Sequence, residues 1–219
     1  MHVITLAARK GGVGKTFLTA SLAVLAAMQS MSLDGADPPD HPGVAVIDLD
    51  PQGSLTTWIN QRPAPFPAMI QMNPSRLMDG VSELKVQGFQ MVVIDTPPGH
   101  GDFVVAAMAV ADLVVIPVKP GDLDLEAALN TLAITESLQR PYALLPNDAT
   151  FRSRAMGLTI RQITEMGLPM LPPIHHRVDA ALSGGRTALE RAPTSRASVE
   201  LRAVMAAINA MLHNIEVPL

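Results

Sequence analysis

Short apolar runs alternate along the chain with longer segments in which apolar residues recur at helical spacing. The runs are rich in Val, Ile and Leu and lack polar alternation, which is typical of strands that are covered on both faces of a sheet. They lie at residues 2–7, 44–50, 91–97, 112–118, 142–146 and 168–174. Helices are predicted at residues 16–31, 54–61, 101–110, 122–138 and 153–166, and from about residue 195 onward. The alternation predicts βαβ units, and therefore a doubly wound α/β fold whose mainly parallel, twisted sheet carries helices on both faces.

Two proline-rich stretches interrupt this pattern. Residues 34–43 read DGADPPDHPG and residues 60–67 read NQRPAPFP. Proline and glycine at this density are typical of turns and loops, so both stretches are predicted to be surface loops. Neither separates two apolar clusters and no segment repeats, so residues 1–219 are expected to form a single domain.

Composition narrows the class of protein. The chain has 219 residues, of which 48% are hydrophobic and 16% are charged, enough apolar material for one full core. It has no cysteine, which excludes disulfides and iron–sulfur ligation, and its six histidines show no H-E-x-x-H spacing, so zinc is not expected. No apolar run reaches the length of about 18 residues that a membrane span needs, and residues 1–10 lack the basic region and long apolar region of a signal peptide, so neither is expected. A cytoplasmic location is expected.

Charge is distributed unevenly. Residues 1–139 carry 7 Lys and Arg against 14 Asp and Glu, whereas residues 140–219 carry 9 against 6, and all 9 are arginine. A solvated surface and a nucleic-acid contact both account for a locally basic C-terminal third.

The loop after the first apolar run has the composition of a phosphate-binding loop. The stretch AARKGGVGKTF lies between a predicted strand and a predicted helix, the context that such a loop requires. Glycines there let consecutive backbone N–H groups converge on an anion, while Lys15 reaches the β- and γ-phosphates and the Thr16 hydroxyl is placed for Mg²⁺. The predicted phosphate-binding residues are Lys10, Gly11, Gly12, Val13, Gly14, Lys15, Thr16 and Phe17.

The loop departs from the pattern G-x-x-x-x-G-K-[ST], because Arg9 stands where the first glycine is expected and Lys10 adds a second lysine. Adjacent glycines at 11 and 12 supply the close approach instead. Two cations so close together are compatible when a triphosphate lies between them, and Lys10 is a candidate to reach a nucleotide on another subunit. The stretch KGGVGKT resembles the deviant Walker A motif of the ParA/MinD superfamily of ATPases, with Lys10 on that family's signature lysine.

Two further motifs match this resemblance, DLDPQG at residues 48–53 and VVIDTPPG at residues 92–99. Asp95, at the end of a predicted strand, has the form of a Walker B carboxylate that holds Mg²⁺ through water. Alternation along the strand sends Asp48 and Asp50 to the same side. The resemblance implies that Asp50 positions the attacking water and that Asp48 lies near the Mg²⁺ site; the alternative is that both acids cap the helix that begins at Ser54.

The resemblance extends over essentially the whole chain, but its three central motifs are far more specific than the C-terminal third. It implies an adenine contact from Asn147, and ATP is favoured over GTP because the chain has NDAT where a GTPase has N-K-x-D. The connection at residues 32–43 is longer than the family's usual one. No helix-turn-helix precedes the ATPase motifs, so the small ParA type is expected.

The implied mechanism uses Lys10, Lys15 and Asp50 as catalytic residues, with Mg²⁺ held by Thr16, Asp48 and Asp95. If Lys10 acts across an interface, two ATP-loaded chains form a homodimer, and a ParB-like or other cargo-adaptor protein stimulates hydrolysis. The dimer is expected to bind nucleoid DNA nonspecifically and to partition or position a plasmid, chromosome or other cargo. Arg177, Arg186 and Arg202 are the candidate DNA contacts.

Two other functions remain open. A MinD-like regulator bound to the membrane would need a basic amphipathic tail, but no Lys or Arg follows Arg202. No membrane partner is therefore expected. A small-substrate P-loop ligase would need a polar substrate pocket for which the sequence shows no motif.

Overall fold

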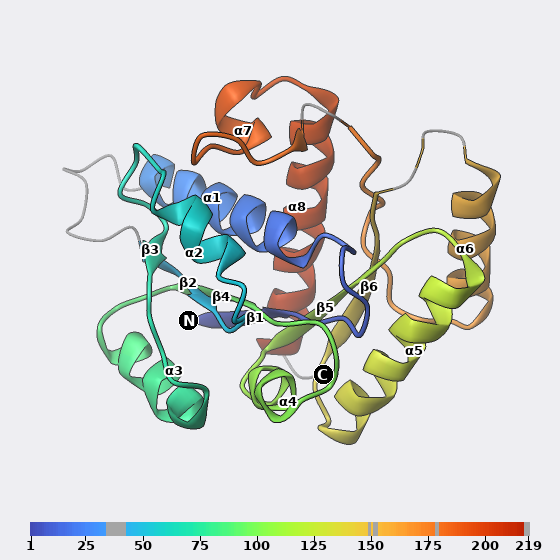
Figure 1. Ribbon diagram of the computed structural model, residues 1–219, viewed down its shortest axis with the longest axis horizontal. Helices are drawn as coiled ribbons and strands as arrows, with labels where there is room; N and C mark the ends of the chain where they lie inside the picture. The colour runs from blue at the N-terminus through green and yellow to red at the C-terminus, as the bar shows by residue number, and fades with distance from the viewer. Residues whose placement is uncertain (34–42, 149, 151–152, 178–179, 217–219) are drawn as a thin grey trace.

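A six-stranded sheet, with every pair of neighbouring strands parallel, forms the centre of the computed structural model (Figure 1). The structure describes residues 1–33, 43–148, 150, 153–177 and 180–216, and this strand count refers to them. The strands lie in the order β3-β2-β4-β1-β5-β6. Their bounds are β1 His2–Leu6, β2 Val44–Asp48, β3 Ala68–Met69, β4 Met91–Asp95, β5 Leu113–Val118 and β6 Tyr142–Pro146.

Helices cover the sheet in two layers, as predicted (Figure 1). One layer contains α1 (Lys15–Leu33), α2 (Ser54–Ile59), α7 (Ala188–Arg191) and α8 (Arg196–Glu216). The other contains α3 (Leu77–Val86), α4 (Asp102–Ala109), α5 (Asp122–Ser137) and α6 (Arg154–Glu165). Alternation along β1 shows the division, because Ile4 and Leu6 pack against the first layer and Val3 against the second. Both faces are buried, which explains the continuous apolar runs of the strands.

The structure differs from the prediction at several elements. Strand β3, the short 3-10 helix η1 (Pro74–Arg76) that follows it, and helices α3 and α7 were not expected. Residues 168–174 do not form a strand: only an isolated bridge joins Met170 to Leu144 of β6. Pro169, Pro172 and Pro173 have no N–H to donate, so a regular ladder cannot form there.

The two proline-rich stretches have different outcomes. Most of the first, residues 34–42, lies outside the described residues. The second is more than a surface loop, because the side chain of Arg62 within it is only 3% exposed. Its packing partners are distant in sequence, which is why composition alone did not reveal the burial.

Strand register brings the acidic motifs to the phosphate-binding loop. Leu6 at the end of β1 and Asp48 at the end of β2 both pair with Asp95 at the end of β4. The chain leaves β1 toward β2 and leaves β4 toward β5, in opposite directions along the sheet. The carboxyl ends of β1 and β4 therefore border a crevice of the kind in which doubly wound sheets bind ligands.

Candidate nucleotide-binding site

The loop between β1 and α1 is shaped for an anion. Gly12 and Gly14 have φ values of 70° and 96°, a conformation that residues with a Cβ rarely adopt. Nothing lies within 4 Å of the position of a Cβ on Gly11 or Gly12, so the loop is open on that side. Helix α1 begins at Lys15 and directs its free N–H groups at the loop. Backbone donors and the positive end of the helix together suit this loop to bind an anion such as phosphate.

Lys15 and Asp95 are the two buried charged residues beneath this loop. The Lys15 residue is 7% exposed and its Nζ lies 3.4 Å from the carbonyl oxygen of Lys10. Burial lowers the pKa of Lys15, while Asp95 and Asp50 oppose this shift. Burial also raises the pKa of Asp95 to about 7, a shift that Asp48 and Asp50 increase and that Thr16 and Lys15 reduce. The site therefore has the backbone N–H groups of the exposed loop on one side and, beneath them, the Asp95 carboxyl group with a pKa near 7.

Thr16 and Asp95 provide oxygen atoms suited to Mg²⁺. The Thr16 hydroxyl donates to Asp95 Oδ2 at 2.6 Å, and Asp95 Oδ1 is buried without a hydrogen-bond partner among the described residues. An unpartnered buried carboxylate oxygen is costly unless a ligand satisfies it, and hard oxygens are what Mg²⁺ prefers. No group of three or more His, Asp or Glu in the described part of the chain is placed to enclose a metal. Thr16 and Asp95 would thus hold the ion together with water and phosphate oxygens.

Asp48 organises the loop that carries the second acidic motif. Its Oδ1 accepts the Asp50 N–H at 3.1 Å, and its Oδ2 accepts both the N–H and the hydroxyl of Thr56 at 2.9 Å. Gly53, the residue before α2, provides no side-chain cap, so Asp48 caps this helix instead. The alternative that Asp48 caps the helix beginning at Ser54 therefore agrees with the structure. That Asp48 also takes part in binding Mg²⁺ stays a prediction. Asp50 is half-buried and accepts the N–H of Gln52 at 3.0 Å.

Lys10 has a different environment from Lys15. Its side chain is 39% exposed, and its Nζ lies 3.1 Å from Asp124 Oδ1 in the first turn of α5. Sequence reasoning missed Asp124, because only the packing of α5 against β5 brings a residue 114 positions away to the loop. The outer lysine is thus held at the surface by α5 while the inner one is buried.

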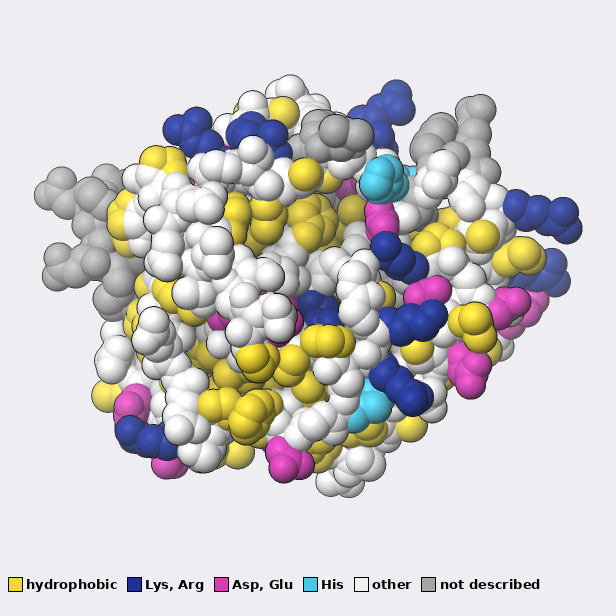
Figure 2. All heavy atoms as spheres, in the orientation of Figure 1, with side chains coloured by type: hydrophobic (Ala, Val, Ile, Leu, Met, Phe, Trp, Pro, Cys, Tyr) yellow, Lys and Arg dark blue, Asp and Glu magenta, His cyan; other side chains and the backbone are white. Residues whose placement is uncertain are grey.

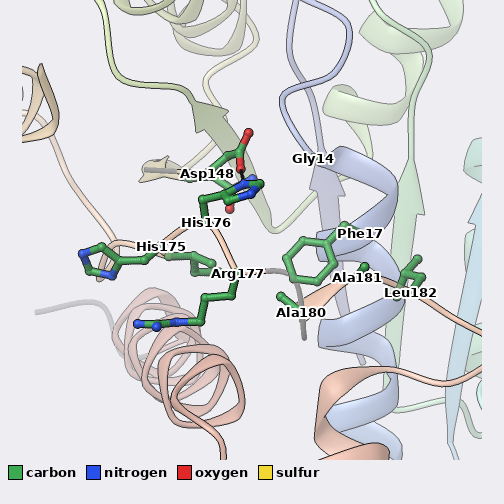
Figure 3. Close-up of a pocket in the computed structure, with 11 residues that line it drawn as sticks. Gly14, Phe17, Asp148, His175, His176, Arg177, Ala180, Ala181 and Leu182 are labelled. Atoms are coloured by element: carbon green, nitrogen blue, oxygen red, sulfur yellow. Dashed lines mark hydrogen bonds and ion pairs between the residues drawn. The ribbon is translucent and has the colours of Figure 1, made fainter. Parts of the chain in front are cut away.

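A pocket beside the loop is suited to a nucleobase. It encloses about 240 Å³ and is lined by the phosphate-binding loop and α1, by the two residues after β6, and by residues of 174–177 and 180–182. Figure 3 shows the Phe17 ring facing His176 across it, whereas His175 and Arg177 point away toward α8. Asp148 Oδ1 accepts a hydrogen bond from His176 Nδ1 at 2.5 Å, and Asp148 Oδ2 pairs with Lys119 Nζ at 2.6 Å. These two partners hold the pKa of Asp148 below its usual range, although burial alone would raise it.

Asn147 lies at the edge of this pocket and is 3% exposed. Its Nδ2 donates to the carbonyl oxygen of Val13 at 2.7 Å. This contact joins the end of β6 to the phosphate-binding loop. The predicted adenine contact is untested, and the visible contact is one that supports the loop.

The three candidate DNA-binding arginines occupy different environments. Arg177 Nη2 pairs with Glu200 Oε1 at 2.7 Å, and its side chain is 18% exposed. Arg186 and Arg202 are exposed, and Arg202 Nη1 donates to the carbonyl oxygen of Pro193 at 2.6 Å. Figure 2 shows Lys and Arg side chains along the upper edge of the molecule, over α7 and the start of α8.

Comparison with known proteins agrees with this site. The model of the CobQ/CobB/MinD/ParA nucleotide binding domain matches residues 4–188. The maintenance of carboxysome distribution protein A of Gloeobacter kilaueensis is 31% identical over 181 residues, which cover 77% of this chain and 73% of that protein. An ATP complex of a Cyanothece McdA variant superposes with a TM-score of 0.74 at 19% identity, covering 95% of this chain and 96% of that one. MinD of Pyrococcus horikoshii with Mg-ADP gives 0.75 at 14% identity, covering 100% and 99%.

The chain belongs to the CobQ/CobB/MinD/ParA nucleotide-binding family, as a P-loop ATPase of the ParA/MinD type. The nucleotide of such an ATPase is ATP, and the oxygen donors of Thr16 and Asp95 are of the kind that Mg²⁺ prefers. In the part of the chain that the structure describes, no helix is both long and apolar enough to cross a membrane.

Proposed function

We propose that two copies of this chain close face to face on ATP and that Lys10 of each copy reaches the nucleotide of the other. The position of Lys10 carries this proposal: its side chain lies at the surface beside α5, whereas Lys15 already occupies the buried side of the loop. The positive charges of Lys10 and Lys15 repel each other at short range. Lys10 can therefore act on a phosphate only from the outer side of the loop, away from Lys15. Dimerisation then depends on which nucleotide is bound.

Within this dimer, the residues of one chain divide the work of hydrolysis. The backbone of the loop and Lys15 orient the phosphates and offset their charge. Thr16 and Asp95 would hold Mg²⁺, which would offset further phosphate charge. Asp50 is proposed to orient that water, because it lies close enough to raise the pKa of Asp95 and is not committed to capping α2. An adaptor protein that orders this loop would set the rate.

Gel filtration with a non-hydrolysable ATP analogue tests the dimer. We expect the analogue to shift the wild-type protein to the dimer and Lys10→Ala to remain a monomer with nucleotide affinity within about threefold of wild type. Lys85→Ala removes an exposed lysine from α3 and serves as the control. A dimer that forms normally in Lys10→Ala would overturn the proposal.

The second part of the proposal is that the dimer binds nucleoid DNA nonspecifically and positions a cargo through an adaptor protein. Support comes from the exposed arginines near α7 and α8, and from similarity to a protein of carboxysome distribution and to ParA of Rhizobium radiobacter. Arg186 and Arg202 are the better candidates, because Arg177 is paired with Glu200.

DNA pelleting over a range of salt concentrations tests this part. Each phosphate contact adds about 0.9 to the slope of log affinity against log salt, so Arg186→Ala with Arg202→Ala should lower the slope by about 2 per chain. Arg161→Ala, an exposed arginine of α6 paired with Glu165, is the control. Vesicles of anionic lipid are included in parallel. Flotation with vesicles and no DNA pelleting would favour a membrane-bound regulator instead, although α8 buries Val204, Met205, Ile208 and Leu212 against the sheet.

A further inference from the structure

Arg62 joins two segments that are far apart in the sequence. Its Nη2 and Nη1 contact the two carboxylate oxygens of Glu190 at 2.9 and 3.2 Å. Nη1 also donates to the Gly185 carbonyl at 2.8 Å, Nε donates to the Phe66 carbonyl at 2.9 Å, and the guanidinium lies 4.9 Å from the centre of the Trp58 ring. A buried, forked arginine with this many partners holds a fixed geometry, unlike a solvated ion pair.

The segment that Arg62 holds, residues 183–191, is called the arm here. It begins with a two-residue turn at Gly184 and Gly185, whose φ values are 54° and 67°, closed by backbone bonds between Ser183 and Arg186 of 3.1 and 3.0 Å. Helix α7 follows, and Glu190 Oε2 accepts the N–H of Thr187 at 2.8 Å to close its first turn. The carboxylate that pairs with Arg62 therefore also shapes the arm.

The arm abuts residues 61–62 directly. A Cβ on Gly185 would lie 2.4 Å from backbone atoms of Gln61 and 2.5 Å from the Cα of Arg62. Real Cβ contacts are never this short, so only glycine permits the approach. A movement of residues 61–62 toward Gly185 would therefore meet no gap and would displace the arm.

Arg62 is also connected to the nucleotide site, through Trp58 and helix α2. Trp58, beneath the guanidinium, belongs to α2, and the N-terminus of α2 is held by the Asp48 carboxylate through Thr56. Asp48 also holds the Asp50 N–H, and both acids lie close enough to Asp95 to raise its pKa. Asp48 is the neighbour of Asp95 in the sheet, and a series of contacts runs from the Asp48 carboxylate through α2 to Arg62 and the arm.

The arm presents cationic side chains to solvent. Arg186 is exposed, and its guanidinium has no hydrogen bond or ion pair with the described residues. Arg191, at the end of the arm, is also exposed, with Nη2 donating to the Ala181 carbonyl. Arginines on a tight turn suit a phosphate backbone, which requires charge and forked donors without base contacts.

We propose that the arm is a contact for DNA phosphates and that nucleotide sets its position through Arg62. The inference rests on the proposed DNA binding. ATP and Mg²⁺ at the site reorganise the loop from Asp48 to Gly53, α2 follows because Asp48 caps it, and Arg62 carries the displacement to Gly185 and Glu190. DNA then distinguishes the ATP-bound protein from the free one by the position of Arg186. The coupling is reciprocal, so DNA also favours the ATP-bound arrangement.

Hydrogen exchange and DNA binding of two variants test the proposal. Arg62→Gln removes the buried positive charge. Glu190→Gln removes the partner carboxylate and should leave Arg62 over the Trp58 ring. Trp58 is the single tryptophan of the chain, so its fluorescence reports whether α2 still responds to nucleotide. Arg76→Gln and Glu83→Gln break an exposed pair whose side chains are 66% and 59% exposed, and are the matched controls. Thermal melting checks that each variant is folded.

In the wild type and both controls, we expect an ATP analogue with Mg²⁺ to change the rate of amide hydrogen exchange in residues 183–191. We also expect it to raise the affinity for DNA about tenfold. In Arg62→Gln and Glu190→Gln, nucleotide affinity stays within about threefold, the exchange response of the arm disappears, and the gain in DNA affinity falls to about twofold. In Glu190→Gln the Trp58 fluorescence response persists, because the contacts from Asp48 to α2 are intact.

An exchange response and a DNA gain that both survive in Arg62→Gln and Glu190→Gln would overturn the role of Arg62. A wild-type protein that binds no DNA, yet shows the Arg62-dependent exchange response, would refute the proposed DNA binding and the phosphate contact but leave the coupling in place. ATP-dependent binding to anionic vesicles in place of DNA, lost in Arg186→Ala, would likewise replace DNA as the partner of the arm.

Discussion

Lys10 and Asp124 form an ion pair between the phosphate-binding loop and the first turn of α5, with 3.1 Å between Nζ and Oδ1. Both side chains are partly exposed, so the pair contributes at most about 1 kcal/mol. It nevertheless competes with any phosphate that Lys10 must reach. The free protein therefore keeps its second lysine engaged on its own surface.

Asp124→Asn should release Lys10 and lower the ATP concentration needed for half-maximal dimerisation by about two- to fivefold, the factor that corresponds to a pair of this strength. Sedimentation across an ATP-analogue titration measures it. Asp122→Asn is the control, because it removes a negative charge from the same helical turn. The Asp122 carboxylate contacts Gln162 and not Lys10. Equal shifts in the two variants would mean that helix charge, and not the pairing of Lys10, is responsible.

Gly14→Ala should destabilise the nucleotide-free protein. Gly14 has a φ of 96°, and a Cβ there would lie 2.3 Å from Asn147 Nδ2. Positive φ alone costs on the order of 1–3 kcal/mol, so the free energy of unfolding should fall by at least that much in a denaturant titration. Gly11→Ala meets nothing within 4 Å and should stay within about 0.5 kcal/mol of wild type. Similar losses in both variants would contradict this assignment.

Asn147→Ala should leave the Val13 carbonyl without its buried donor. We expect the affinities for ATP and for GTP to fall by the same factor, about tenfold, and the free energy of unfolding to fall by about 1–3 kcal/mol. Calorimetric titration with both nucleotides separates the two roles of this residue. A loss confined to ATP would instead establish the predicted adenine contact. Asn130→Ala, on the exposed side of α5, controls for removal of an amide.

Asp95 should make the nucleotide-free protein less stable as pH rises. Its folded-state pKa of about 7 lies above the ordinary value of 3.8, so between these values the folded state binds more protons than the unfolded state. Unfolding free energy should therefore fall through that window, by on the order of 2–4 kcal/mol, and level off above pH 7. Asp95→Asn should lose this slope and be the more stable protein at pH 8.

The same group links Mg²⁺ to pH in the opposite direction. Metal requires the ionised carboxylate, so apparent Mg²⁺ affinity should increase up to about pH 7 and then become constant. Denaturant titrations from pH 4 to 8, with and without Mg²⁺, measure both effects. Asp102→Asn, an exposed carboxylate at the start of α4, should leave both profiles unchanged. A flat stability profile in the wild type would contradict burial as the cause.

Local pattern was a sufficient guide to the five long strands and six of the helices. Runs such as VAVID and MVVID are apolar at every position that a two-faced burial requires, so their state does not depend on which neighbours they find. Residues 168–174 show the limit of that argument. Their apolarity is right for a buried strand and they do follow β6, but three prolines deny the ladder its donors. Strand β3, with two residues, is defined only by its pairing with β2.

Carboxylates show a similar limit. The motifs placed Asp48, Asp50 and Asp95 at one edge of the sheet, and register brings Asp48 beside Asp95 there. Only the fold shows that Asp48 caps α2 while Asp95 is buried with an unpartnered oxygen. The same residue type thus has two roles, because burial and hydrogen-bond partners, not identity, set the energy of a charge.

By itself, the sequence determined the parallel sheet, the phosphate-binding loop after its first strand and the family to which they belong, since these depend on periodicity and on neighbouring residues. Tertiary structure decided what distant residues do to that site. The pairing of Lys10 with Asp124, the support of Val13 by Asn147 and the clamp of Arg62 on Glu190 span 114, 134 and 128 positions. Contacts at such separations depend on how helices pack on a sheet, and no local pattern encodes that packing.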